Sequence, residues 1–233
     1  MLKRSGMLLS VAILLAAGPL LAQRGGMMGM MPPSMNGVWN PVVGSGATYE
    51  MVGKDGKKQT ISIAIVSKED SGGQTGYWLE MMTGDNPAQA NVIQMLMVKD
   101  ASQQMSAAKM IIQQAGGRGP MEISGSMMGM MSARGGAAPP TPKSDFREGA
   151  ENVGTESVNT PAGSFDTMHW RNKDGANVWI STKAGPWGFV KSVSADGATM
   201  TLVKVITDAK SHIVGTPQSM DSMMGGARGR GQD

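Results

Sequence analysis

The chain has 233 residues, a formal net charge of +3 and no cysteine, and it is rich in glycine (33 residues) and methionine (24 residues). The missing cysteine excludes a disulfide framework, thiolate metal sites and a lipid-modified N-terminus. Lys3 and Arg4 carry two of the three net charges, so the rest of the chain is nearly neutral. This balance argues against a nucleic-acid partner.

The N-terminal segment predicts export. Lys3 and Arg4 precede an uncharged apolar run from Met7 to Leu21, and Ala22 offers the small residue that a signal peptidase needs. The run is shorter than the roughly 20 apolar residues of a membrane span. We therefore expect a signal peptide over 1–22, a mature chain in the periplasm or cell envelope, and no transmembrane span after cleavage. A retained N-terminal anchor is the alternative.

Methionine and glycine concentrate in three segments. The string Met-Met-Gly-Met-Met occurs at 27–31 and again at 127–131, and a related Met/Gly-rich stretch closes the chain. Glycine-rich sequence without periodicity has a high entropic cost of ordering. The pattern predicts a disordered leader at 23–35, a flexible linker at 116–148 and a disordered tail at 218–233.

Alternating apolar residues predict strands in the first half, about 36–115. Tyr49 and Met51 alternate with polar neighbours, Ile61 to Ile65 form a second strand, and Tyr77 to Leu79 lie in a third. Asp55-Gly56 is typical of a hairpin turn. Residues 85–117 are ambiguous: strands at about 90–99 and 107–114 are favoured, and one helix is the alternative.

The second half, about 150–217, has the same character. Strands are predicted at 153–160, 165–171, 178–181, 187–193 and 200–206, with Asp-Gly turns at 174–175 and 196–197. Short strands separated by frequent turns indicate an antiparallel β domain. We expect one mainly β domain over 36–217, interrupted by the linker.

Three stretches of the second half carry a resemblance to a known family. They are Pro161-Ala162-Gly163-Ser164-Phe165, Trp179-Ile180-Ser181 and Pro186-Trp187-Gly188-Phe189-Val190-Lys191. They resemble uncharacterised bacterial envelope proteins that are similar to the periplasmic lipoprotein-carrier fold. The resemblance covers roughly 36–217. It implies a curled antiparallel sheet or half-barrel with an apolar inner face, and it implies no catalytic residue.

Four aromatic residues are candidates for lining a ligand cavity: Tyr49, Trp78, Trp187 and Phe189. Gly188 lies between two rings and would leave space beside them. The alternative is an ordinary filled core, since apolar stripes usually pack against protein.

The methionine strings are candidates for binding a soft metal ion. Neutral thioether sulfur prefers Cu(I) and Ag(I) to hard cations. The candidate ligands are Met27, Met28, Met30, Met31, Met127, Met128, Met130 and Met131. The alternative is a low-complexity or oxidant-absorbing segment, because methionine is soft and oxidises reversibly.

No catalytic constellation is recognisable. The sequence contains no G-x-S-x-G, H-E-x-x-H or phosphate-loop string, and its only histidines, His169 and His212, are expected to be solvated. Asp166, Asp174 and Asp196 are expected to lie in or beside turns and to cap backbone groups there. A hydrolase therefore ranks last, and no cofactor is predicted.

The sequence thus favours an exported, non-catalytic envelope protein. Carrier-like or scaffold-like binding of a lipid or another apolar ligand is the leading hypothesis. A Cu(I)- or Ag(I)-chelating envelope protein is the alternative, and a passive structural protein is the third possibility.

Overall fold

A computed structural model describes residues 39–99, 105–117, 119–133, 147 and 149–222. The predicted signal peptide with its cleavage site, the leader with Met27, Met28, Met30 and Met31, and most of the C-terminal tail lie outside the described residues. So does 134–146 in the predicted linker.

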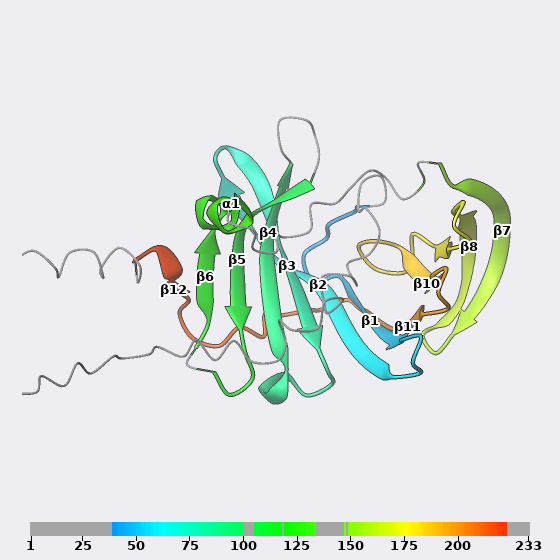
Figure 1. Ribbon diagram of the computed structural model, residues 1–233, viewed down its shortest axis with the longest axis horizontal. Coiled ribbons are helices and arrows are strands. Elements are labelled where there is room, and N and C mark those ends of the chain that lie inside the picture. Colours follow the sequence, from blue (N-terminus) through cyan, green and yellow to red (C-terminus); the bar gives the residue numbers. More distant parts are fainter. Residues whose placement is uncertain (1–38, 100–104, 118, 134–146, 148, 223–233) are drawn as a thin grey trace, which may run out of the picture. The chain divides into compact units, whose positions relative to one another are not determined.

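The described residues form one open sheet, as the sequence predicts for a mainly antiparallel β fold. The strand order is β12-β6-β5-β4-β3-β2-β1-β11-β10-β9-β8-β7 (Figure 1). Strand β12 pairs with β6 in parallel, whereas the other pairings are antiparallel. The strands are β1 (Gly46–Val52), β2 (Lys58–Ser71), β3 (Gln74–Thr83), β4 (Asn91–Lys99), β5 (Met105–Gln113), β6 (Met121–Ser124), β7 (Glu151–Thr160), β8 (Gly163–Arg171), β9 (Asn177–Ile180), β10 (Phe189–Val193), β11 (Thr199–Ile206) and β12 (Gln218–Ser219).

The ambiguous region 85–117 forms two strands, so the alternative of a helix there is wrong. Asn86 and Pro87 start only the single 3-10 turn η3 (Pro87–Gln89), after which β4 and β5 follow close to the predicted positions. Strand β4 buries residues on both of its faces, Val92 and Gln94 on one and Met95 on the other. A strand buried on both sides loses the simple alternation that identifies strands in a sequence.

Strand β1 joins the two halves of the chain into one sheet. It pairs with β2 on one side and with β11 on the other, so that Tyr49 lies opposite both Ile61 and Leu202. At the far end, β7 also contacts β11, four positions away in the strand order. The sheet therefore bends back on itself over β7 to β11.

The predicted linker at 116–148 contains regular structure over its first half, which corrects that prediction. Residues 121–124 form β6 and residues 125–133 form helix α1 (Gly125–Ala133). Ser124 supplies the N-cap, because its Oγ accepts a hydrogen bond of 3.2 Å from the Met127 backbone N–H. The predicted tail likewise begins with β12.

Strands β1 to β6 have two chemically distinct faces, which the register defines. Side chains opposite one another share a face. The methionine face carries Tyr49, Ile61, Ile63, Leu79, Met81, Met95, Met97, Met105, Met110 and Ile123. The strap face carries Thr48, Ser62, Trp78, Glu80, Gln94, Leu96, Ile111 and Gln113.

Candidate functional site

Three of the four predicted cavity residues lie together. The Tyr49 hydroxyl donates a hydrogen bond of 3.3 Å to the Phe189 carbonyl, and Trp187 is two residues before this acceptor. Tyr49, Trp187 and Phe189 are each no more than 1% exposed, and burial raises the pKa of the Tyr49 hydroxyl. The indole of Trp39 lies 5.4 Å from that of Trp187, centroid to centroid, and 6.5 Å from the ring of Tyr77. These residues form an aromatic cluster beside the methionine face, in which Tyr49, Trp187 and Phe189 are buried and Trp39 and Tyr77 are partly exposed.

Gly188 leaves no free space between the rings, contrary to the expectation from the sequence. A Cβ at this residue would lie 2.8 Å from the Ser181 carbonyl oxygen, and its φ is +69°. Its carbonyl accepts a hydrogen bond of 2.7 Å from the Ser181 N–H. A Cβ at Gly185 would lie 3.0 Å from the Gly46 carbonyl oxygen, and its φ is +81°. Both glycines therefore let the β9–β10 connection close tightly and hold Trp187 against β1.

Trp78 does not belong to this cluster. It neighbours Leu79 in β3, and since successive side chains of a strand point to opposite faces, it lies on the strap face. There it packs with Leu96 and Ile111, and its indole N–H donates a bond of 2.9 Å to Glu69. The prediction of one cavity lined by all four aromatic residues is wrong in this respect.

Methionine dominates the buried lining next to the aromatic cluster. Tyr77 lies opposite Met97, and Leu79 lies opposite Met95, which in turn lies opposite Met110. The buried methionines of this face come from three adjacent strands and are Met81, Met95, Met97, Met105 and Met110. The aromatic cluster and these methionines together are the candidate ligand site.

Helix α1 places further methionines beside β5 and β6, next to the methionine face. The helix contacts β5 and β6 (Figure 1). Met127 and Met128 are buried, whereas Met130 is 49% exposed. Of the second predicted metal-binding string, the structure thus describes two sulfurs directed into protein and one directed largely toward solvent.

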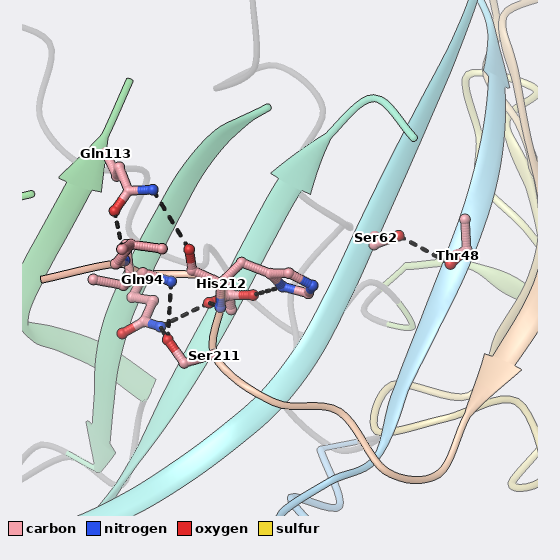
Figure 2. Close-up of polar contacts among 9 residues, drawn as sticks. Thr48, Ser62, Gln94, Gln113, Ser211 and His212 are labelled. Carbon is pink, nitrogen blue, oxygen red and sulfur yellow. Dashed lines mark hydrogen bonds and ion pairs between the residues drawn. The ribbon is translucent and has the colours of Figure 1, made fainter. Parts of the chain in front are cut away.

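The strap face has a polar centre that sequence reasoning missed. Residues 207–217, here called the strap, connect β11 to β12 and cross this face (Figure 2). Glu80, only 3% exposed, accepts hydrogen bonds from Gln94 (2.7 Å), the His212 backbone N–H (3.0 Å) and His212 Nδ1 (2.7 Å). Gln113 donates to the His212 carbonyl and accepts from the Val214 N–H. The adjacent strands β3, β4 and β5 thus each contribute one polar side chain that forms hydrogen bonds with the strap.

The strap also has an apolar anchor. Ile213 packs against the cluster of Trp78, Leu96 and Ile111 and against a second cluster that contains Met82 and Val92. The only sequence signal for this arrangement is a polar residue inside each of two apolar runs, Glu80 in β3 and Gln94 in β4.

The Glu80–His212 pair lacks a nucleophile in the described part of the chain. The adjacent hydroxyl, that of Ser211, accepts hydrogen bonds from Gln94 (2.6 Å) and the Ile213 N–H (3.1 Å). A catalytic serine would instead bond to the imidazole. The carboxylate and the imidazole fasten the strap to β3.

His169 is buried, which corrects the expectation that it is solvated. Its Nδ1 lies 3.0 Å from Glu156 Oε1 and its Nε2 lies 2.8 Å from Asn177 Oδ1. The imidazole stacks on Trp179 with a centroid separation of 4.4 Å, and Lys191 lies over the same indole. Trp179 also donates to Glu156. The cluster ties β7, β8, β9 and β10 together and leaves neither ring nitrogen of His169 free for a ligand.

Within the described ranges, no group of three or more His, Asp or Glu side chains could hold a metal ion. No helix in those ranges is long and apolar enough to cross a membrane. Two of the three aspartates expected to cap turns do so: Asp174 accepts from the Ala176 N–H and Asp196 from the Ala198 N–H. Asp166 instead lies within strand β8, which corrects the expectation for that residue.

Comparison with protein-family models finds no match for this chain, and comparison with curated proteins finds none either. Among solved structures, the chain is similar to a "putative exported protein with YmcC-like fold" from Bacteroides fragilis, with 13% identity, 72% of this chain and 97% of that one covered, and a TM-score of 0.33. A "putative lipoprotein" from Parabacteroides distasonis matches with 12% identity, coverage of 75% and 100%, and a TM-score of 0.34. MucB matches with 13% identity, coverage of 72% and 55%, and a TM-score of 0.36.

Proposed function

We propose that this chain is an exported, non-catalytic protein that binds an apolar ligand, such as an acyl chain, against its methionine face. The observation that carries the proposal is the lining itself, in which buried methionines from β3, β4 and β5 lie side by side. Unbranched thioether side chains adapt to irregular apolar shapes, and proteins use them on surfaces that accept varied guests.

Helix α1 is the proposed cover of this lining. It contacts β5 and β6, where Met110 and Ile123 of the methionine face are buried while Lys109 and Glu122 of the other face are partly exposed. The helix has only nine residues and includes Gly129, which weakens a helix interior. A cover of low intrinsic stability suits a site that a guest must enter.

Three features support the proposal of an exported, non-catalytic protein. The N-terminal segment has the charge and apolar pattern of a signal peptide. The polar clusters around Glu80 and His169 use their hydrogen-bonding groups on one another. The resemblance of the second half to carrier-like envelope proteins points in the same direction.

Methyl-labelled methionine provides a direct test. Protein labelled with ¹³C at the methionine methyls is titrated with methyl palmitate delivered from vesicles, and each resonance is assigned by a Met→Leu variant. Saturable shifts are expected at Met95, Met97 and Met110, and none is expected at Met168, which is exposed on β8 and is the internal control. The proposal fails if no saturable shift occurs and no lipid accompanies protein purified from its host.

Soft-metal binding is the second candidate. What favours it is the gathering of Met127, Met128 and Met130 on one short helix next to a methionine-rich face. Competition with a Cu(I) chelator would compare the wild type with a variant in which Met127, Met128, Met130 and Met131 are leucine. Leucine keeps the apolar volume but removes the sulfur ligands, so equal Cu(I) affinity in the two proteins ends this candidate.

A further inference from the structure

The buried indole of Trp187 has a hydrogen-bond donor that protein does not use. Among the described residues, no acceptor lies within hydrogen-bond reach of Trp187 Nε1, although the side chain is 1% exposed. Buried polar groups in folded proteins nearly always have a partner, and leaving a buried N–H unpaired costs free energy. A donor buried this deeply therefore needs a hydrogen-bond acceptor, and the described residues do not supply one.

The position of this donor connects it to the candidate site. The Trp187 ring contacts that of Trp39, which contacts that of Tyr77, and Tyr77 lies opposite Met97 on the methionine face. The nearby Tyr49 hydroxyl donates to Phe189. The Trp187 indole, with its unpaired N–H, is thus connected to the methionine face through Trp39 and Tyr77, and α1 contacts β5 and β6 at the other side of that face.

We infer that the ligand is a neutral acyl ester whose carbonyl oxygen accepts a hydrogen bond from Trp187 Nε1, with its acyl chain along the methionines toward α1. This inference rests on the proposed function. Indole nitrogen only donates, so its partner must be an acceptor. A carbonyl oxygen meets this need without a charge, whereas a buried carboxylate would require a cation beside it. A plain hydrocarbon would leave the donor unpaired.

Two variants and two ligands test the inference. The affinities of wild type, Trp187→Phe and Trp78→Phe are measured for methyl palmitate and for heptadecane, an apolar chain without an acceptor. Trp187→Phe is expected to weaken binding of the ester about tenfold, the effect of one hydrogen bond, and to leave alkane binding unchanged. Trp78→Phe, the matched control on the strap face, is expected to change neither affinity.

The indole N–H resonance provides a second readout, which does not depend on the variant's folding. In ¹⁵N-labelled wild type, assigned through contacts with the Trp39 ring, the Trp187 Nε1 proton should move to lower field with the ester but not with the alkane. If ester and alkane bind equally well to wild type and to Trp187→Phe, without this shift, the inference is overturned and the proposed function stands. If neither ligand binds the wild type, both are overturned.

Discussion

Glu69 connects three strands of the strap face through a single carboxylate. Its oxygens accept from Lys109 Nζ at 2.8 Å and from Trp78 Nε1 at 2.9 Å. The hydrogen bond from Lys109, with a smaller contribution from Trp78, lowers the pKa of Glu69, and the hydrogen bond to Glu69 raises the pKa of Lys109. Glu69 on β2 and Lys109 on β5 thereby reach across Trp78 on β3.

Replacing Lys109 tests this contact by its pH dependence. A carboxyl with a lowered pKa stabilises the fold above its ordinary value of about 4.3, and this stabilisation is lost as the pH falls through the lowered value. Lys109→Met should reduce the free energy of unfolding at pH 7 by about 1 kcal/mol or less, since both groups are over a third exposed. Urea unfolding should show the difference from wild type shrinking at pH 3.

The exposed pair of Lys57 and Asp55 is the control for this measurement. The hydrogen bond from Lys57 also lowers the pKa of the Asp55 carboxyl, but both side chains lie on a solvated turn. Lys57→Met should therefore change stability less than Lys109→Met does. An equal or larger effect would show that the bridge over Trp78 contributes nothing beyond a surface ion pair.

Gly188 is the residue at which backbone geometry matters most for the aromatic cluster. Gly188→Ala would impose both a positive φ on alanine and a clash with the Ser181 carbonyl. We expect a loss of more than about 1 kcal/mol in unfolding free energy, with altered near-UV circular dichroism from Trp187. Gly197 also has a positive φ, of +86°, but a Cβ there would have open space around it. Gly197→Ala therefore measures the cost of the backbone strain without a clash. Equal losses in the two variants would contradict a role for the close approach.

At the scale of elements, the strap behaves as one unit because one buried carboxylate anchors it. Glu80→Ala would leave Gln94 and both His212 donors without this acceptor. Unpaired buried donors should cost about 2–3 kcal/mol of unfolding free energy, and hydrogen exchange at the amides of His212 and Val214 should accelerate. Ser211→Ala removes a single acceptor and should cost about 1 kcal/mol. Unchanged exchange in Glu80→Ala would refute the anchoring role.

The elements differ in how far local sequence predicts them. The strands β8 and β11 follow from alternation and from the Asp-Gly turns beside them. Helix α1 was missed because Met-Met-Gly-Met-Met has no apolar stripe and contains glycine; its formation depends on the Ser124 cap and on contacts with β5 and β6. The strap has no periodicity at all. Its path depends on Glu80, Gln94 and Gln113, which lie far from it in sequence.

At the scale of the whole sheet, the pairing of β1 with β11 could not be predicted. The two strands lie near opposite ends of the described chain. The sequence is equally compatible with each strand pairing only with strands of its own half. The same limit applies to the faces: Tyr49, Trp78 and Trp187 look equivalent as apolar aromatic residues, and only the register separates Trp78 from the other two. Of the candidate site, Tyr49, Trp187 and Phe189 could be named from the sequence, whereas the strand methionines beside them could not, because only the register places them on one face.

Because β1 links the halves, unfolding should be a single cooperative transition. A central strand loses a ladder hydrogen bond when proline replaces one of its residues, which is why proline is confined to edge strands and bulges. Glu50 lies opposite Thr60 of β2 and Thr201 of β11, so Glu50→Pro should destabilise both halves together. Glu50→Ala keeps the backbone N–H and serves as the control.

Single-tryptophan variants can follow each half in such an experiment. One retains Trp78 in the first half and the other retains Trp179 in the second, and urea unfolding is followed by fluorescence. The two midpoints should coincide in the parent protein and fall by the same amount with Glu50→Pro, since coincident transitions are the signature of two-state unfolding. If Trp179 kept its midpoint while that of Trp78 fell, the second half would fold independently, and the sheet would be two cooperative units joined at β1 rather than one.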